Sequence, residues 1–326
     1  MSRVLPTISV TLVTFDSADF LVRCLDSLAT QTAPPLEVVV VDNASRDASV
    51  AIARRHPAVT RVIENAHNVG FAAGQNQAIA ASSGAWVLTL NPDVVLDATF
   101  LATLAARAVQ PRPLGTLCGK LLRLGADGAP VVPARIDSTG IEFTRAFRHF
   151  DRGSEEPDDG RWAAEELVFG ASAAAALYRR EMIEDVAIEG EFFDETFFAY
   201  REDADVAWRA QLLGWDCLYV PSALGYHVRR VLPSRRGRLP AMLNRHSVKN
   251  RFLMRIKNAD LAVWQRCALA GITRDALVVG GCLAREWSSL PAFWQVATLW
   301  PRARRQRAII QARRRRDGAV IARWFR

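Results

Sequence analysis

The stretch Leu36-Glu-Val-Val-Val-Val41, followed at once by Asp42, decides the fold class of this 326-residue chain. It is continuously apolar, which is typical of a strand buried on both faces of a parallel sheet. Further strands are predicted at 8–14, 60–64, 85–90 and 115–121, and helices at 18–29, 48–55, 72–81 and 97–109. Strands spaced by helices of this length predict βαβ units, and hence an α/β, Rossmann-like fold with a mostly parallel central sheet flanked by helices.

The rest of the chain divides into three parts. Residues 125–160 are polar and rich in Gly and Pro, which predicts an irregular insertion that covers a site. A strand at 167–178, a helix at 203–213 and a strand at 216–220 follow, and the pattern is helical from about residue 240. We therefore divide the chain into an α/β unit, 1–240, and a helical region, 241–326.

The net charge of +8 is unevenly distributed along the chain. Residues 1–227 hold 19 Lys and Arg against 30 Asp and Glu, whereas residues 228–257 hold ten basic residues and no acidic one. Residues 302–326 hold ten basic residues against one acidic residue. Two basic segments behind an acidic region predict an anionic partner, either nucleic acid or a lipid surface.

The cysteines and the apolar segments indicate in which cellular compartment the protein is expected. The five cysteines are scattered, odd in number and never spaced C-x-x-C, which favours a reducing compartment over a disulfide framework or a zinc site. No uncharged apolar run of about 18 residues occurs, so no membrane-spanning helix is expected. The apolar opening 8–14 lacks a small-residue cleavage site and is interpreted as a strand. We expect a cytoplasmic protein, soluble or bound to a membrane surface.

Polar side chains follow three successive predicted strands. These segments are Thr14-Phe-Asp16, Asp42-Asn-Ala-Ser45 and Asn91-Pro-Asp93. Ligands of open parallel sheets bind beyond the carboxyl ends of the strands. Acidic groups there suit a base or ribose held by hydrogen bonds, together with a metal ion that holds the phosphates. For an isolated Asp42, a turn or helix-capping role is the ordinary alternative.

Two further segments extend this constellation. The loop Asn68-Val-Gly-Phe-Ala-Ala-Gly74-Gln-Asn76 opens a helix and could place backbone N–H groups near a diphosphate, although helix packing alone explains its glycines equally well. His227 closes the run 220–227, which follows the predicted strand 216–220, and it could join Asp93 at a divalent ion, which one carboxylate binds poorly.

The densest group of carboxylates is Glu202-Asp203-Ala-Asp205 at a helix start. Acids favour helix N-termini, and Asp205 with Arg209 forms an i, i+4 pair, so part of the cluster has a structural explanation. Glu202 and Asp205 share a helix face while Asp203 points elsewhere. Asp203 is therefore free to act as a general base.

Taken together, these motifs resemble family 2 glycosyltransferases over about residues 7–258. Gly214-Trp215, Pro221 and Lys249-Asn250-Arg251 are further matches, in the same order and spacing. Within the family, the chain is most similar to bacterial rhamnosyltransferases of cell-surface polysaccharide assembly. The segments that carry this closer similarity are Asp137-Ser-Thr-Gly140, Phe169-Gly170-Ala-Ser172 and the Arg-rich ending Gln311–Phe325.

The resemblance implies a GT-A fold and an inverting, single-displacement reaction. It assigns Asp42 to the nucleobase and places Thr14, Asp16, Asn68, Gly74, Asn76 and Asn91 near the donor. It assigns a divalent metal, Mg²⁺ or Mn²⁺, to Asp93 and His227, the role of base to Asp203 with Glu202 beside it, and the acceptor surroundings to Gly170, Asp205, Arg209 and Asn250. Asn91 stands where relatives carry the first acid of the Asp-x-Asp metal motif, and an amide is the weaker ligand. Ala173 stands where relatives usually carry Gly.

The region 241–326 combines tryptophans with arginines on predicted helices. Its aromatic and basic landmarks are Trp264, Trp287, Trp294, Trp300, Trp324 and the run Arg313–Arg316. Trp and Arg at the rim of an apolar face are typical of a helix lying on anionic lipid, which predicts a peripheral protein on the inner face of the plasma membrane. A packed bundle with a solvated basic face and contacts of a homo-oligomer are the alternatives. The chain contains no nucleic-acid-binding motif.

The leading hypothesis is the transfer of L-rhamnose from dTDP-β-L-rhamnose to a hydroxyl of a lipid-linked glycan. Another donor, a UDP-hexose or UDP-galactofuranose, is the first alternative. A nucleotidyltransferase is the second, but it usually needs a Gly-rich, basic phosphate loop, and 10–17 contains neither Gly nor Lys or Arg. A non-catalytic, membrane-bound scaffold is the third.

Overall fold

The computed structural model describes residues 5–110, 112–125, 127–229 and 240–326. One half of its central sheet consists of parallel strands in the order β4-β1-β2-β3. These strands are β1 (Ile8–Thr14), β2 (Glu37–Asp42), β3 (Arg61–Glu64) and β4 (Trp86–Leu90). In register, Thr14 lies opposite Asp42, so both predicted strand ends meet at one edge of the sheet. The predicted fold class is confirmed.

Helices cover both faces of this half-sheet. They are α1 (Ala18–Ala29), α2 (Ser49–Arg55), α3 (Gly70–Ala80) and α4 (Phe100–Ala108). Val38 and Val40 pack into the core shared with α1, α2 and α4, whereas Val39 and Val41 pack toward Ala78 of α3. Burial on both faces explains why the β2 sequence is continuously apolar.

The other half of the sheet is mixed. It contains β6 (Leu114–Arg123), β10 (Glu166–Val168), β11 (Ala175–Arg179) and β12 (Asp216–His227). β12 runs parallel to β6, and β11 lies antiparallel between β4 and β6. The single strand expected at 167–178 is divided in two. In the segment between them, Gly170 packs so close to α6 that an added Cβ would lie 2.2 Å from Ala207.

A short strand that the sequence did not reveal determines the site. β5 (Val94–Leu96) pairs antiparallel with the far end of β12, with Val94 opposite His227. β12 is thus longer than the predicted strand, and its last residue reaches Asp93, which directly precedes β5.

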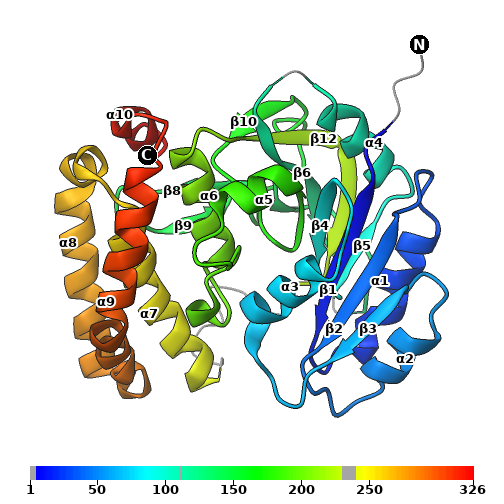
Figure 1. Cartoon of the computed structure of the whole chain (residues 1–326), viewed down its shortest axis with the longest axis horizontal. Helices are drawn as coiled ribbons and strands as arrows, with labels where there is room; N and C mark the ends of the chain where they lie inside the picture. The colour runs from blue at the N-terminus through cyan, green and yellow to red at the C-terminus, as the bar shows by residue number, and fades with distance from the viewer. Residues whose placement is uncertain (1–4, 111, 126, 230–239) are drawn as a thin grey trace.

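The insertion and the segments after it lie between the sheet and the C-terminal helices (Figure 1). Their elements are β7 (Ile136–Ser138), β8 (Ile141–Phe143), β9 (His149–Asp151), α5 (Arg180–Val186), the 3-10 helix η1 (Glu195–Phe197) and α6 (Glu202–Leu212). β7 pairs with β6, and β8 and β9 form a hairpin. The rings of Phe143, Trp208 and Phe325 contact one another in the core, which joins the insertion, α6 and the C-terminus.

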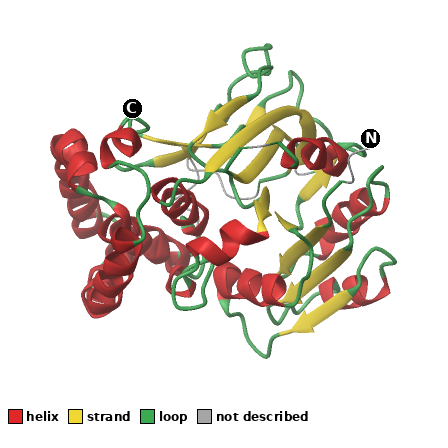
Figure 2. Ribbon diagram, turned by 45° about the horizontal axis from the view of Figure 1, so that its top comes forward, coloured by secondary structure: helices red, strands yellow, loops and turns green. Residues whose placement is uncertain are grey.

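The C-terminal region is helical from Ala241 and stands at one end of the sheet (Figure 2). Its elements are α7 (Ala241–Asn258), α8 (Leu261–Ala284), η3 (Trp287–Ser289), α9 (Pro291–Ala312) and α10 (Gly318–Ala322). α9 packs along α7, and α8 is the outermost helix (Figure 1). Part of the basic stretch 228–257, residues 230–239, lies outside the described residues.

Two expectations about this region need correction. By length and composition α8 could cross a membrane, since an 18-residue window has a mean hydropathy of 1.5 and only 17% of it is buried. The adjacent pair Arg274 and Asp275 interrupted the apolar run and hid this property in the sequence. The length and composition of α8 thus correct the argument from apolar runs, but one such helix is weak evidence for a span, and the expectation that no helix crosses a membrane stays a prediction.

The Arg313–Arg316 run is not a free basic face. Arg313 and Arg315 bind Asp185, Arg314 binds Asp260, and Arg316 binds Asp216. These arginines attach the C-terminal segment to α5, β12 and the start of α8. The charge that predicted an anionic partner is largely neutralised here within the protein.

Candidate active site

A cleft of about 260 Å³ opens at the carboxyl ends of β1, β2 and β4. Three of the predicted donor and metal residues line it, namely Asn68, Asn91 and Asp93. Aromatic and small side chains complete the wall, among them Phe15, Phe71 and Phe198. A cleft at this position, with apolar walls and a few polar groups, has the character of a nucleotide-binding site.

Asp42 lies behind the cleft wall and is almost fully buried. Its carboxylate accepts hydrogen bonds from the Thr14 hydroxyl at 2.9 Å and from the Ser45 backbone N–H at 2.8 Å. Asp16 contacts the same loop after β2, because its Oδ1 accepts a hydrogen bond from the N–H of Arg46 at 2.8 Å. These contacts fix the two strand-end loops against each other, while the nucleobase contact of Asp42 stays a prediction.

The predicted diphosphate loop makes hydrogen bonds within the protein, and its contact with a donor stays a prediction. Asn68 accepts from the Gly70 N–H at 2.9 Å, and the Phe198 carbonyl accepts from the Ala72 N–H at 3.1 Å, so two of the N–H groups that open α3 already have partners. An added Cβ at Gly74 would lie 3.0 Å from the Val13 side chain, so this glycine allows α3 to approach β1. Packing is therefore the explanation that the structure supports for Gly74.

Asn76 holds a loop and does not line the cleft. Its side chain donates to the Phe193 carbonyl at 2.8 Å and accepts from the Phe193 N–H at 2.9 Å. This two-way bond fixes the segment that leads into η1. A donor contact of Asn76 stays a prediction.

Asp93 and His227 meet as predicted. Asp93 Oδ1 lies 3.3 Å from His227 Nε2, and the other ring nitrogen, Nδ1, lies 2.8 Å from Asp137 Oδ2. Burial alone would lower the pKa of His227, but Asp137 and, secondarily, Asp93 raise it to about 9. The imidazole is thus held between two carboxylates and is charged at neutral pH.

The carboxylate of Asp137 belongs to a chain of ion pairs that continues beyond His227. Its Oδ1 lies 3.0 Å from Arg123 and 2.8 Å from Arg229, and Arg229 also binds Asp151 at 2.6 Å. Asp137 is fully buried, and despite that burial His227 and the arginines hold its pKa below the usual range. The insertion strands β7 and β9 therefore supply two acids to the site.

The Asp93–His227 pair fits a divalent cation. Within the described residues, no group of three or more His, Cys, Asp and Glu side chains could hold a metal ion, so Asp93 and His227 would provide at most two protein ligands. Mg²⁺-type ions commonly take one or two protein ligands and complete their shell with phosphate oxygens and water. Asp137 on Nδ1 is the outer partner that orients a metal-binding histidine. A cation would have to displace the proton of His227.

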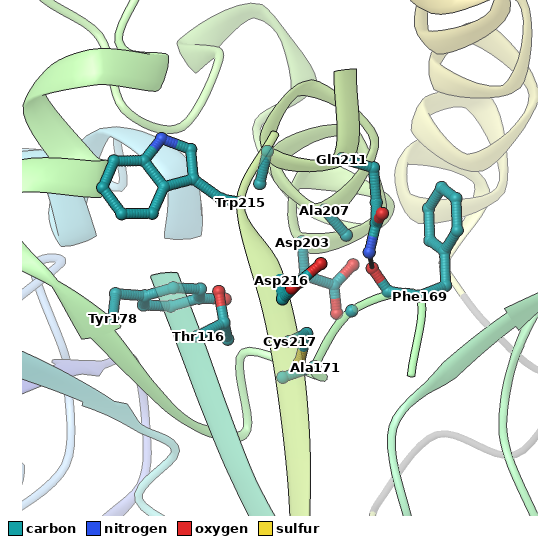
Figure 3. A pocket seen from close by; sticks show the side chains of 12 residues that line it. Thr116, Phe169, Ala171, Tyr178, Asp203, Ala207, Gln211, Trp215, Asp216 and Cys217 are labelled. Atoms are coloured by element: carbon teal, nitrogen blue, oxygen red, sulfur yellow. Dashed lines mark hydrogen bonds between the residues drawn. The ribbon is translucent and has the colours of Figure 1, made fainter. Parts of the chain in front are cut away.

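Asp203 is half-buried at the start of α6, and Figure 3 shows it directed toward a small cavity beside Tyr178 and Cys217. Its carboxylate accepts from the N–H of Ala204 at 2.7 Å and of Ala173 at 3.3 Å. Burial and, next, the Asp151 carboxylate raise the pKa of Asp203 to about 6. This value suits a general base near neutral pH. Asp203 does not line the donor cleft.

Glu202 is buried beside Asp203, and burial and the Asp203 charge raise its pKa well above the ordinary value. Its Oε2 has no hydrogen-bond partner in the described part of the chain. Both neighbouring carboxyls therefore have raised pKa values, and Asp203 is the one that lines the small cavity.

Asp205 and Arg209 lie in the interior. Asp205 accepts from Arg209 at 3.0 Å, from Lys257 at 2.9 Å and from Asn258 at 2.7 Å. Lys257 also binds Asp194 at 2.6 Å. This buried network joins α6 to α7, so the structure supports a positioning role for both residues, and their acceptor contact stays a prediction.

Asn250 shapes the loop in front of Asp203. Its amide donates to the carbonyls of Phe197, Ala199 and Tyr200 at 2.8 to 3.0 Å. Phe198, Tyr200 and Arg201 have positive φ angles, so this loop needs such support. Gly170 lines the small cavity at Asp203, next to α6.

Comparison with known proteins identifies the chain. The family model described as Glycosyl transferase family 2 matches residues 9–187, more than half of its length. The chain belongs to glycosyl transferase family 2. It is thus a glycosyltransferase that uses a nucleotide-sugar donor, and the resemblance inferred from its motifs is confirmed.

The chain is similar to several glycosyltransferases with known activities or structures. An N-acetylglucosaminyl-diphospho-decaprenol L-rhamnosyltransferase of Mycobacterium tuberculosis is 31% identical over 248 residues, which cover 70% of this chain and 76% of that protein. The mannosyltransferase PcManGT from Pyrobaculum calidifontis, solved with GDP-Man and Mn²⁺, has a TM-score of 0.55 at 19% identity and aligns with 99% of this chain and 88% of its own. GalNAc-T7, solved with UDP, GalNAc and Mn²⁺, has a TM-score of 0.62 at 14% identity over 82% of this chain, which spans 52% of that structure. These structures support the GT-A fold.

The sequence interpretation missed Asp151, Arg123 and Arg229 and did not assign a role to Asp137. Asp137 was noted only within a motif typical of rhamnosyltransferases. The signal for the others is weak, since a lone Arg or Asp in an irregular insertion has no periodicity that reveals its partner.

Proposed function

We propose that this glycosyltransferase transfers L-rhamnose from dTDP-β-L-rhamnose, with inversion at the anomeric carbon, to a hydroxyl of a lipid-linked glycan. The name of the mycobacterial relative supports both the sugar and the acceptor class, since that protein is an L-rhamnosyltransferase acting on a diphospho-decaprenol-linked sugar. The charges of the site support a displacement of this type.

In the reaction, Asp203 accepts the proton of the acceptor hydroxyl. The acceptor oxygen forms a bond to the anomeric carbon as the bond from that carbon to the diphosphate oxygen breaks, and the nucleoside diphosphate leaves with the electron pair. Glu202 keeps its proton, because burial and the Asp203 charge favour the neutral form. The N–H groups of Ala173 and Ala204 hold the Asp203 carboxylate in place.

Asp93 and His227 would hold Mg²⁺ or Mn²⁺, and a cation bound there offsets the charge that develops on the leaving diphosphate. Asp137 fixes the orientation of His227, and Arg229 connects Asp137 to Asp151. The single observation that carries the proposal is this chain of ion pairs, which runs from Asp93 in the donor cleft to Asp151, the acid whose charge raises the pKa of Asp203.

The test measures donor binding and hydrolysis for dTDP-rhamnose, UDP-galactofuranose, UDP-glucose, UDP-N-acetylglucosamine and GDP-mannose, with and without Mg²⁺ or Mn²⁺. We expect metal-dependent preference for dTDP-rhamnose. Preference for another donor would overturn the rhamnosyl assignment but keep the mechanism. Binding of none would favour the non-catalytic scaffold.

Asp203→Asn tests the mechanism separately. Loss of a positioned general base slows turnover by roughly 10²- to 10⁴-fold, while donor affinity stays unchanged. Asp159→Asn, an acid in an exposed loop, is the matched control. Full activity of Asp203→Asn would remove this residue from the reaction.

A further inference from the structure

The outward face of α8 is mostly apolar and is interrupted by the exposed Gln265, Arg266 and Thr273. At about 100° per residue, its exposed side chains fall on one continuous stripe. The large apolar members are Leu261, Leu269, Ile272, Leu277, Val279 and Leu283, and Leu269 is 83% exposed. Alanine and glycine fill most of the space between them. A surface helix of a globular protein normally turns such a stripe toward the core.

Two of the three charged residues of α8, Arg274 and Asp275, lie on the inner side, whereas Arg266 is exposed. Asp275 accepts from Arg251 at 3.1 Å and from Arg255 at 2.5 Å, both on α7. Arg274 beside it is half-buried as well. α8 therefore has inverted polarity, with an ion-paired inner side and an apolar outer side, which is the arrangement expected of a helix that faces lipid.

The apolar face continues onto the next two elements. Trp287 of η3 is 71% exposed and Trp294 of α9 is 74% exposed, and Trp300 follows on α9. Of the seventeen large apolar side chains exposed in the described part of the chain, eleven lie in 241–326. A contiguous surface of this kind marks an interaction site.

The α8 helix is fixed parallel to the protein surface. On its inner side, an added Cβ at Gly271 would lie 2.8 Å from the Phe147 ring, so helix and insertion are in close contact. α9 returns beside it and is held by Arg302, which binds Glu191 at 2.7 Å. Because α8 is attached to the protein along its inner side, its outer face is the part that is available to lipid.

We propose that the outer face of α8, together with Trp287 and Trp294, inserts into the surface of a lipid bilayer. Exposed Arg266, Arg285 and Arg304 flank this face and complement anionic headgroups. Tryptophan at its edge is the residue type enriched at membrane interfaces. The basic run Arg313–Arg316 contributes little, because its charges are already paired within the protein.

This docking would also determine how far the active site lies from the membrane surface. Phe147 contacts α8 on one side of the β8–β9 turn, and Asp151 at the end of β9 binds Arg229 of the site. The insertion thus contacts both α8, through Phe147, and the ion pairs of the active site, through Asp151. The proposal does not depend on which sugar is transferred.

The experiment is co-sedimentation of the full chain with phosphatidylcholine vesicles, with and without phosphatidylglycerol. We expect binding to both, stronger with the anionic lipid. Leu269→Glu combined with Ile272→Glu should weaken it by roughly 100-fold, about tenfold for each apolar side chain kept from the acyl region. Leu36→Glu, a 52% exposed leucine of the α/β unit, is the matched control and should bind normally.

A second measurement follows the insertion directly. All five native cysteines are buried, so Leu277→Cys gives one accessible position for an environment-sensitive dye. We expect a blue shift of its emission on adding vesicles and a monomer by sedimentation without lipid. Unchanged emission, vesicle binding unaffected by the double variant, or a lipid-free dimer that buries Leu277 would each overturn the proposal.

Discussion

The carboxylates around Asp203 and the arginines of Arg313–Arg316 are comparably dense in the sequence, but the fold treats them in opposite ways. All four arginines bind carboxylates of the protein itself. The hydrogen bonds that Asp203 accepts come instead from two backbone N–H groups, and its neighbour Glu202 is an acid. The arginines are neutralised and fasten the chain, whereas the adjacent Glu202 and Asp203 keep raised pKa values.

The difference shows that charge density alone does not indicate function. A like-charge pair in a half-buried position is costly and is retained where proton transfer needs it. Paired charges at the end of a chain attach it to the body. In the C-terminal region the surface feature that stands out is accordingly the apolar face of α8.

The largest expected effect is on stability, at Asp205, a fully buried ion-paired acid. In Asp205→Ala, Lys257 and Arg209 lose their shared acid inside the protein. Removing one partner from such a buried network lowers the free energy of unfolding by roughly 3–5 kcal/mol. Urea unfolding measures it, with Asp159→Ala as the exposed control. A loss below about 1 kcal/mol would show that α6 and α7 do not depend on this network.

The next largest effect is expected at Asp137. This residue is ion-paired with arginines, like Asp205, and it also orients His227 in the candidate active site. Asp137→Asn leaves His227 without the carboxylate that orients Nδ1. Loss of such an outer partner weakens metal binding by about 10- to 100-fold. Mn²⁺ binding to the purified protein, followed by calorimetry, is the measurement. Asp158→Asn, an acid of the same insertion bound to Lys120, should bind Mn²⁺ normally. Equal affinities in both variants would contradict the role of Asp137.

Much of the fold and part of the site could be predicted from the sequence. The apolar run of β2 and the polar residues after β1, β2 and β4 indicate a sheet edge by local pattern alone. The pairing of Asp93 with His227 was inferred from family motifs, and the structure explains it by the three-residue strand β5. A strand this short has no periodicity to reveal it.

The parts that were missed depend on contacts between distant segments. Asp137, Asp151 and Arg229 come together only because β7 pairs with β6 and β9 pairs with β8. The inverted polarity of α8 depends on Arg251 and Arg255 of another helix. The donor role predicted for Gly74 stays open, because a loop that packs and a loop that binds phosphate share the same glycine spacing.

A smaller effect is expected at the attachment of the arginine segment. Asp185 receives both Arg313 and Arg315, but these arginines are 37% and 56% exposed at the side chain, so solvent screens the pairs. Asp185→Ala should therefore lower the free energy of unfolding by only about 1 kcal/mol. Amide exchange of 313–326 should quicken in this variant. Unchanged exchange would show that the remaining contacts hold the segment.

The smallest expected effect is a shift in the pH dependence of activity, which depends on the ionisation of Asp203. Asp203 is an active base only when ionised, so kcat/KM should rise with pH through a midpoint near 6, its raised pKa. Asp151→Asn removes a negative charge that raises this pKa and frees the positive charge of Arg229 that lowers it. Both changes favour the ionised form, so the midpoint should move to lower pH, whereas Asp159→Asn should leave it in place. A midpoint that moves upward, or does not move, would mean that Asp151 does not act on the base and that the charge chain ends at Arg229.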